Sequence, residues 1–228
     1  MWRQTWHDLL FAHWPVPAAA LRPLVPAALE IDEYGGTSWV GLVPFRMTNV
    51  TLRGWPAVPW LSAFPEMNLR LYVSHGGRSG VWFVSLDAAR LLAVWTARRL
   101  VGLPYFHASM SVRRDGDVVR YVSERRGPGP RVALDAVYGP TGPVEVAAPG
   151  TLAHFLTARY CLFARRRTGT LARLDIDHPP WPLQPAAATF TTNLVAEPQG
   201  IRLPDTTPVL HFSHRIDVTG SGLQSPAS

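Results

Sequence analysis

The fold is decided by the stretch Glu66-Met67-Asn68-Leu69-Arg70-Leu71-Tyr72-Val73-Ser74. Apolar and polar residues alternate strictly along it, which is the pattern of a β-strand with one apolar face. The polar face carries Glu66, Asn68, Arg70 and Tyr72. It permits two interpretations: the face meets solvent, as is normal in antiparallel sheets, or the sheet closes on itself and the face lines a polar interior.

Turn signals on either side of this strand predict a series of hairpins. His75-Gly76-Gly77-Arg78 leads the chain back into a strand over 80–86, and Asp115-Gly116 joins strands over 104–112 and 118–123. Gly35-Gly36 predicts another hairpin, between 30–34 and 38–52. Further strands are expected at 132–138, 171–176, 187–196 and 209–218.

Helical patterns are fewer. We expect a short helix over 18–24, a helix capped by Ser85 or Asp87 that runs to Leu100, and a helix over 150–163. The proline-rich stretch 54–65 reads as an irregular loop. The sequence therefore predicts an α+β, β-rich fold in which a large curved antiparallel sheet carries two or three helices. We expect a single domain over 1–219 and a loose tail over 220–228.

Composition limits the chemistry. All 22 basic residues among the 228 are arginine, so no lysine is present to form a Schiff base. The net charge of +6 comes with short arginine clusters, which raises nucleic-acid binding as a lesser alternative. However, aromatic and apolar segments separate the clusters, and no nucleic-acid-binding motif accompanies them.

The lone cysteine and the lengths of the apolar runs bear on location. Cys161 lies in an apolar run and reads as a buried, inert thiol, which is compatible with a reducing compartment. Asp8, His13 and Pro15 interrupt what would be the apolar core of a signal peptide. No apolar run approaches the ~18 residues of a membrane span. We expect a cytoplasmic protein without a membrane segment.

The histidines give little support for a metal site. His211 and His214 are three residues apart on an expected strand and so point to opposite faces. We interpret His13 and His178 as structural, each holding a loop by hydrogen bonds. Tyr105 and His107 share a strand face, which suits an acid/base pair, although aromatic packing explains them equally well. No metal and no cofactor is expected.

Segments along most of the chain resemble the YqjF-like family of uncharacterised conserved bacterial proteins. The resemblance rests on Phe11-Ala12-His13-Trp14-Pro15, Trp39-Val40-Gly41-Leu42-Val43-Pro44-Phe45, Phe64-Pro65-Glu66-Met67-Asn68-Leu69-Arg70-Leu71-Tyr72-Val73, Gly80-Val81-Trp82-Phe83-Val84-Ser85-Leu86-Asp87, Leu103-Pro104-Tyr105, Arg159-Tyr160 and His178-Pro179-Pro180-Trp181. It implies an acetoacetate-decarboxylase-like fold, a β-rich cone or barrel around an interior pocket.

The resemblance to acetoacetate decarboxylase also gives a mechanistic contrast. That enzyme carries a glycine-arginine-glutamate run and then a proline followed by two lysines, the first of which forms the Schiff base. Here the arginine corresponds to Arg98, whereas Tyr105 and Phe106 stand where the lysines would be. A pocket glutamate of the enzyme corresponds to Glu66. The resemblance thus implies a retained pocket without the imine mechanism.

Two functions remain open at this point. In the first, the chain is an enzyme of proton-transfer or lyase type acting on a small carbonyl or carboxylate compound. Glu66 would be the acid/base group and Tyr105 a hydrogen-bond donor, and either Arg98 or Arg70 would anchor an anionic group. In the second, the same pocket binds a metabolite without turnover. Either way we expect a small, anionic ligand and further binding residues at Asn68, Arg70, Tyr72 and His107. The sequence leaves a homo-oligomer open.

Overall fold

The computed structural model describes residues 2–52, 63–90, 102–166 and 168–225. In this part of the chain a 12-stranded sheet dominates. Its strands are β1 (Trp2–Pro15), β2 (Glu30–Ile31), β3 (Trp39–Leu52), β4 (Phe64–His75), β5 (Arg78–Ala88), β6 (Tyr105–Asp115), β7 (Val118–Arg125), β8 (Ala133–Pro140), β9 (Cys161–Arg165), β10 (Leu171–Asp177), β11 (Gln184–Leu194) and β12 (Val209–Gly220). The helical elements are α1 (Ala18–Leu21), α3 (Leu152–Thr157) and the 3-10 turns η1 (Arg22–Leu24) and η2 (Glu197–Gln199).

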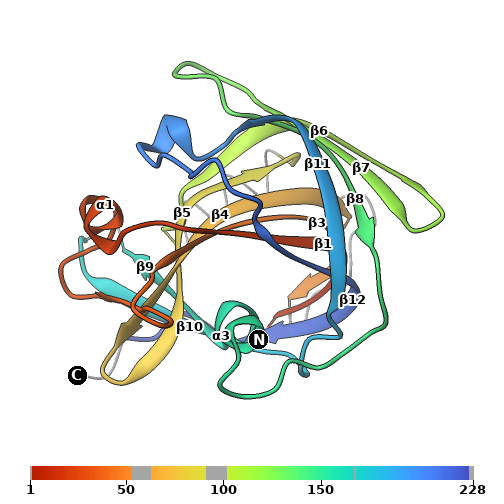
Figure 1. Cartoon of the computed structure of the whole chain (residues 1–228). Helices are drawn as coiled ribbons and strands as arrows, with labels where there is room; N and C mark the ends of the chain where they lie inside the picture. Colours follow the sequence, from red (N-terminus) through yellow and green to blue (C-terminus); the bar gives the residue numbers. More distant parts are fainter. Residues whose placement is uncertain (1, 53–62, 91–101, 167, 226–228) are drawn as a thin grey trace.

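The sheet closes on itself in two rings that share a wall. One is a closed barrel of nine strands, which run in the order β5, β6, β7, β8, β11, β12, β1, β3 and β4. The other is completed by β9 and β10, which connect β5 to β12. Figure 1 shows the shared strands β1, β3 and β4 crossing the middle of the molecule, with β6, β7 and β8 on one side and α3, β9 and β10 on the other. Two compartments therefore lie back to back across these strands.

The alternation along β4 divides its side chains between the two compartments. Met67, Leu69 and Leu71 belong to the apolar core on the side of β7 and β8, together with Leu134 and Tyr138. The polar residues of β4 point to the other side. The prediction of a β-rich α+β fold that closes into a barrel is confirmed, and most strand pairs are antiparallel, whereas β5 pairs in parallel with β6 and with β9.

Two of the expected hairpins are confirmed and the third is wrong. β4 and β5 pair through to His75 and Arg78, and β6 and β7 pair through to Asp115 and Val118. Gly35 and Gly36 do turn the chain, at positive φ angles, but the turn closes only an isolated bridge between Tyr34 and Thr37. β2 pairs with β4 instead, and β3 lies between β1 and β4.

The first strand was not foreseen from the sequence. β1 pairs with both β12 and β3, and most of its residues from Asp8 to Trp14 are buried. Because both faces of this segment are covered, it shows no alternation of polar and apolar residues. Asp8 has a φ of 55°, where β1 departs from regular register with β3. Such a bulge further masks the pattern of a strand.

Two expected helices are corrected. Ser85 and Asp87 lie within β5 and do not cap a helix, because the carboxylate of Asp87 is bound by Arg125. The remainder of that expected helix, through Leu100, lies mostly outside the described residues. The helix expected over 150–163 is capped by Thr151 but ends at Thr157. Residues 158–160 follow in neither a helix nor a strand, and β9 begins at Cys161, since pairing with β5 and β10 prevails over the helical period.

The chain end is held more firmly than expected. The backbone N–H groups of Ser221 and Gln224 donate to the carbonyls of Asp175 and Arg173. The expected loose tail therefore does not begin at Gly220. The irregular loop expected over 54–65 lies mostly outside the described residues. None of the helices in the described ranges is long and apolar enough to cross a membrane.

Candidate functional site

The polar face of β4 points into the compartment enclosed by β9 and β10 and is buried there. Glu66, Asn68, Arg70 and Tyr72 are 4%, 5%, 8% and 1% exposed. Of the two interpretations of this face, solvent exposure is therefore wrong. Charged side chains are rarely buried to this extent without partners, so their contacts decide what the compartment can do.

A cavity of about 40 Å³ lies within this compartment. Asn68 and Arg70 line it, whereas Glu66, Tyr72, Tyr105 and His107 do not. The lining residues are Trp6, Leu9, Phe11, Val43, Phe45, Asn68, Arg70, Val81, Phe83, Thr157, Arg159, Ile176, His178 and Trp181. The walls are thus mostly apolar and aromatic with a few polar groups, which is typical of small-molecule sites.

Arg70 is the cationic group of this cavity. Its Nη2 donates to the carbonyl of Leu156 at 2.8 Å, and its Nε donates to the hydroxyl of Tyr72 at 3.2 Å. The guanidinium also lies 5.3 Å from the ring centroid of Phe11. Among the described residues, no carboxylate forms an ion pair with it. Arg70 is thus a buried cation without an acidic partner in that part of the chain.

Tyr72 and His13 fix the position of Arg70. The hydroxyl of Tyr72 lies 2.6 Å from Nε2 of His13. Burial, reinforced by the nearby charge of Arg70, holds the pKa of His13 well below its usual value, so the imidazole is neutral. A Cβ at Gly41 would lie only 2.9 Å from the Tyr72 hydroxyl and 3.2 Å from Cγ of Arg70. Glycine at position 41 therefore makes room for this polar network, and His13 supports the network, whereas the sequence suggested that it holds a loop.

A second buried arginine has its own partner. Arg159 lines the cavity and forms an ion pair with Asp32. Its guanidinium also lies over the rings of Phe155 and Tyr72, at 4.4 and 5.1 Å from their centroids. The sequence analysis did not select Arg159 as a site residue. The family resemblance could have indicated it, because Arg159-Tyr160 is among the segments on which that resemblance rests.

Glu66 is a buried carboxyl group with a single side-chain partner in the described residues. The hydroxyl of Tyr105 donates to Oε2 of Glu66 at 2.8 Å. Burial raises the pKa of Glu66 to about 8, and the hydrogen bond from Tyr105 opposes that shift only in part. Burial and the neighbouring Glu66 together raise the pKa of Tyr105 well above its usual value. At neutral pH, Glu66 therefore holds a proton that it can donate.

The other predicted site residues are placed less centrally. His107 follows Tyr105 on β6, beside Ala88 of β5, but the hydroxyl of Tyr105 is bound to Glu66. The structure thus places the Tyr105 hydroxyl against Glu66, whereas the sequence suggested His107 as its partner. Arg98 lies outside the described residues.

Two lining residues carry buried polar atoms that have no hydrogen-bond partner in the described part of the chain: Oδ1 of Asn68 and Nε1 of Trp181. A buried polar group without a partner costs free energy, on the order of 1–3 kcal/mol. His178 lies beside Trp181, at 5.1 Å between ring centroids, and its Nδ1 donates to the carbonyl of Pro179. Burial lowers the pKa of His178, so this ring is also neutral. Counting the described residues alone, the cavity therefore offers the cation of Arg70 without an acidic partner, an acceptor on Asn68 and a donor on Trp181.

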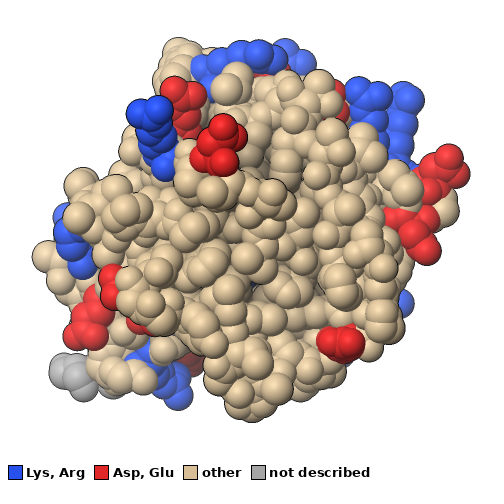
Figure 2. Space-filling model, viewed as in Figure 1, with Lys and Arg blue, Asp and Glu red and all other residues tan. Residues whose placement is uncertain are grey.

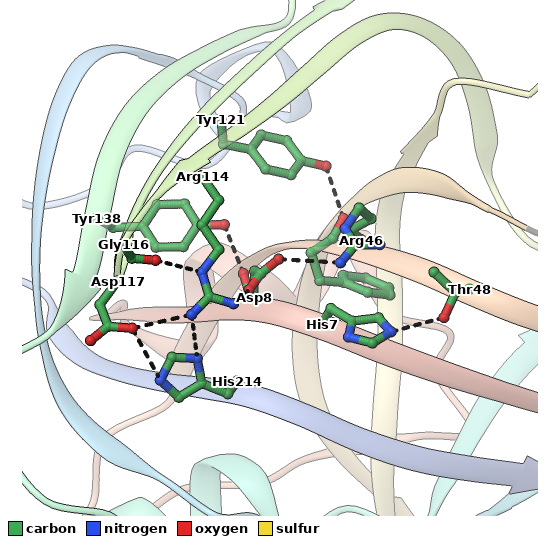
Figure 3. Close-up of polar contacts among 11 residues, drawn as sticks. His7, Asp8, Arg46, Thr48, Arg114, Gly116, Asp117, Tyr121, Tyr138 and His214 are labelled. Carbon is green, nitrogen blue, oxygen red and sulfur yellow. Dashed lines mark hydrogen bonds and ion pairs between the residues drawn. The ribbon is translucent and has the colours of Figure 1, made fainter.

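A separate cluster of charges surrounds Asp8 on the opposite side of the shared wall. Figure 3 shows the Asp8 carboxylate between Arg114 and Arg46, at 3.3 and 3.6 Å, and the Tyr138 hydroxyl donating to the Asp8 carbonyl. Arg114 also contacts Asp117 and the Gly116 carbonyl. Each charge in this cluster has a partner, so we assign it a structural role in holding the β1 bulge.

The arginines that reach the surface are dispersed. On the face shown in Figure 2, basic side chains lie at the periphery, including a row along the top edge, and the centre of the face carries none. This face gives no support to nucleic-acid binding. In the described residues, no group of three or more histidine, cysteine or acidic side chains is placed to hold a metal ion. Cys161 is a free, buried thiol.

Comparisons with known proteins agree with the architecture. A family described as "Uncharacterized conserved protein (COG2071)" matches residues 3–217. The chain is 44% identical over 216 residues to the "Uncharacterized protein YqjF" of Bacillus subtilis (strain 168), a match that covers 95% of this chain and 88% of the relative. The family resemblance of the sequence is confirmed.

Solved structures with the same fold are more distant in sequence. The enduracididine biosynthesis enzyme MppR complexed with pyruvate is 14% identical with a TM-score of 0.67, over 98% of this chain and 89% of that one. An acetoacetate-decarboxylase-like enzyme from Sphingomonas wittichii RW1 is 16% identical with a TM-score of 0.63, over 98% and 93%. Acetoacetate decarboxylase from Legionella pneumophila is 15% identical with a TM-score of 0.62, over 98% and 87%. At these identities the likeness shows the fold alone.

Proposed function

The chain belongs to the family of the uncharacterised conserved protein YqjF, and from this membership we propose that it binds a small carboxylate compound inside its barrel. The observation that carries this proposal is Arg70. Its guanidinium is buried, lines the cavity and has no acidic partner in the described residues. A carboxylate ligand would supply the missing negative charge and accept charge-assisted hydrogen bonds.

The other polar groups of the cavity suit the same ligand class. The free Nε1–H of Trp181 can donate to a carbonyl or carboxylate oxygen, and Oδ1 of Asn68 can accept from a hydroxyl. The neutral rings of His13 and His178 add no second positive charge. Structural neighbours that hold pyruvate or take their name from acetoacetate fit a small oxo acid, but the proposal rests on Arg70.

Glu66 is the titratable group we propose for proton transfer, to a compound bound beside it and not to one held at Arg70. It lies four residues before Arg70 on the same face of β4, roughly 13 Å away along the strand, and does not line the cavity. Because its pKa is raised to about 8, the carboxyl can donate a proton near neutral pH and accept one back. Tyr105 holds it in place by a hydrogen bond. A Schiff base takes no part, because the chain contains no lysine.

Binding is tested by thermal shift with pyruvate and 2-oxobutanoate. At about 100 times Kd, we expect the Tm of the native chain to rise by roughly 5–10 °C. Arg70→Met removes the cation and should abolish this shift. Arg78→Met is the matched control, because the Arg78 side chain is 59% exposed and lies outside the cavity lining. If the Arg70→Met variant folds and both acids still raise its Tm, Arg70 does not bind the carboxylate.

Proton transfer is tested separately, by NMR of solvent deuterium exchange into the methyl group of pyruvate. If the native chain catalyses this exchange and the Glu66→Gln variant does not, the result would support catalysis of proton transfer by Glu66. The alternative is a binding protein without turnover, and pyruvate binding through Arg70 with no catalysed exchange would favour it.

A further inference from the structure

Three polar groups around the interior cavity have incomplete interactions within the described ranges. They are a cation, an acceptor and a donor: the guanidinium of Arg70, Oδ1 of Asn68 and Nε1 of Trp181. Asn68 and Arg70 project from the same face of β4, roughly 7 Å apart along the strand. Cζ of Arg70 and the ring centroid of Trp181 lie 5.3 and 4.8 Å from the ring centroid of Phe11, which also lines the cavity. The three groups therefore surround one space.

The remaining polar side chains of the lining are already engaged. The hydroxyl of Thr157 donates to the carbonyl of Ala153 at 2.7 Å. Arg159 forms its ion pair with Asp32, and the ring of His178 is bound to a backbone carbonyl. A compound in the cavity is therefore selected by how well it matches the free cation, acceptor and donor.

A hydroxyl next to a carboxylate matches all three groups. A hydroxyl both donates and accepts, so it can donate to Oδ1 of Asn68 and accept from Nε1 of Trp181 while the carboxylate binds Arg70. A carbonyl oxygen in the same place only accepts, which leaves the Asn68 acceptor unpaired. An ammonium group donates, but it adds a second positive charge beside a cation that has no acidic partner among the described residues.

The size of the cavity limits the length of the acid. At about 40 Å³ it has room for roughly three water molecules, which is comparable in size to an acid of about three carbons. We infer that the ligand is a short 2-hydroxy carboxylate, with its hydroxyl between Asn68 and Trp181. The inference rests on the proposed function, because it assigns the carboxylate to the same arginine.

The test compares four three-carbon acids that differ only at the carbon beside the carboxylate: lactate, pyruvate, alanine and propanoate. Calorimetry on the full chain measures each affinity, with the two lactate enantiomers taken separately. We expect the tighter lactate enantiomer to bind about tenfold more tightly than pyruvate, since only the hydroxyl pairs the buried acceptor. Propanoate, which leaves both the acceptor and the donor unpaired, and alanine should bind more weakly than pyruvate.

A matched pair of variants assigns the preference to Asn68. Asn68→Leu keeps a side chain of similar size but removes the acceptor, so the ratio of lactate to pyruvate affinity should fall to within about twofold of one. Asn193→Leu is the control. Oδ1 of Asn193 is also buried without a partner in the described part of the chain, but Asn193 lies on β11 and does not line the cavity. This variant should keep the native ratio.

The outcomes separate this inference from the proposed function. If pyruvate binds as tightly as lactate and Arg70→Met abolishes both, the carboxylate site is retained and the 2-hydroxy acid is overturned. If none of the four acids binds, both fail. A lactate preference that persists in a folded Asn68→Leu variant would overturn the assigned hydroxyl contact. If that variant does not fold, the order of the four acids on the native chain still decides the inference.

Discussion

Glu66 and Asp87 are two buried carboxyl groups on adjacent strands, and they lie on opposite sides of the same wall. Glu66 is paired in register with Ala88, and Asp87 with Met67. On the side of the nine-stranded barrel, Arg125 binds Asp87 through Nε at 2.9 Å and Nη2 at 2.6 Å. On the cavity side, the Tyr105 hydroxyl is the only side-chain partner of Glu66 among the described residues. Burial raises the pKa of both groups, but at Asp87 the guanidinium opposes the shift.

The difference separates structural charges from those available to a ligand. In the nine-stranded barrel, Asp87 and Asp8 each bind an arginine within the described residues. In the cavity compartment, Glu66 has no cation and Arg70 no anion in the same part of the chain. Arg70 lines the cavity and can form a charge-assisted hydrogen bond with a bound compound, whereas Glu66 is held protonated beside Tyr105. The site that we propose is therefore marked by a buried cation that has no acidic partner among the described residues.

The largest effect on stability is expected from breaking the ion pair between Arg125 and Asp87. Arg125→Ala leaves the Asp87 carboxylate buried without its cation, which should lower the free energy of unfolding by about 3–5 kcal/mol. The side chains are 11% and 0% exposed, so water cannot replace the partner readily. Urea unfolding at pH 7 measures the loss. The double variant Asp87→Asn, Arg125→Met is the control and should recover much of it. A small loss in the single variant would contradict the assigned role of this pair.

The next effect concerns the pH dependence of stability. Because the pKa of Glu66 is about 8 in the folded chain and about 4.5 unfolded, the folded state holds the extra proton between these values. Stability should therefore fall as pH rises through this window, by about 1.4 kcal/mol per unit at most and roughly 3 kcal/mol from pH 5 to pH 8. Urea unfolding at several pH values measures the slope, which Glu66→Gln should reduce by that amount. Parallel pH curves for the two proteins would show that Glu66 is not protonated in the fold.

The smallest effect is expected from removing the hydrogen bond that Glu66 accepts from Tyr105. Tyr105→Phe removes the hydrogen bond that lowers the pKa of Glu66, so this pKa should rise further, by less than about one unit. The Glu66 carboxyl resonance in a pH titration by NMR reports the change. Phe preserves the ring, so stability at pH 5 should stay within about 1.5 kcal/mol of the native chain. An unchanged midpoint would mean that the hydroxyl does not influence Glu66.

The sequence predicted much of the architecture where local patterns were clean. The alternation of β4, its turn at Gly76-Gly77 and the partner strand β5 were correct, because a period of two and a glycine turn are local properties. β1 and β9 were missed or read as helix, since both are buried strands whose conformation depends on neighbours far along the chain. Local propensity gives no information about such pairing.

The site was predicted in part. The polar face of β4 was selected as a candidate, and the structure buries it; Asn68 and Arg70 line the cavity, whereas Glu66 and Tyr105 contact each other outside its lining. Arg159, His178 and Trp181 were not selected as lining residues, because they reach the cavity from segments that are about 90 residues or more from β4 along the chain. Only their place in the family resemblance hinted at them. Whether these residues act on a ligand stays a prediction for the experiments above.

The sequence alone determined two things about this protein: a β-rich chain that alternates polar and apolar residues along β4, and chemistry that cannot use a lysine imine. Both are properties of residue identity and local order. Only the tertiary structure decided that the polar face is interior, and that among the described residues Asp87 forms an ion pair whereas Glu66 and Arg70 form none. The physical reason is that burial and ion pairing depend on closing the sheet through β9 and β10, which brings together residues that the chain keeps far apart.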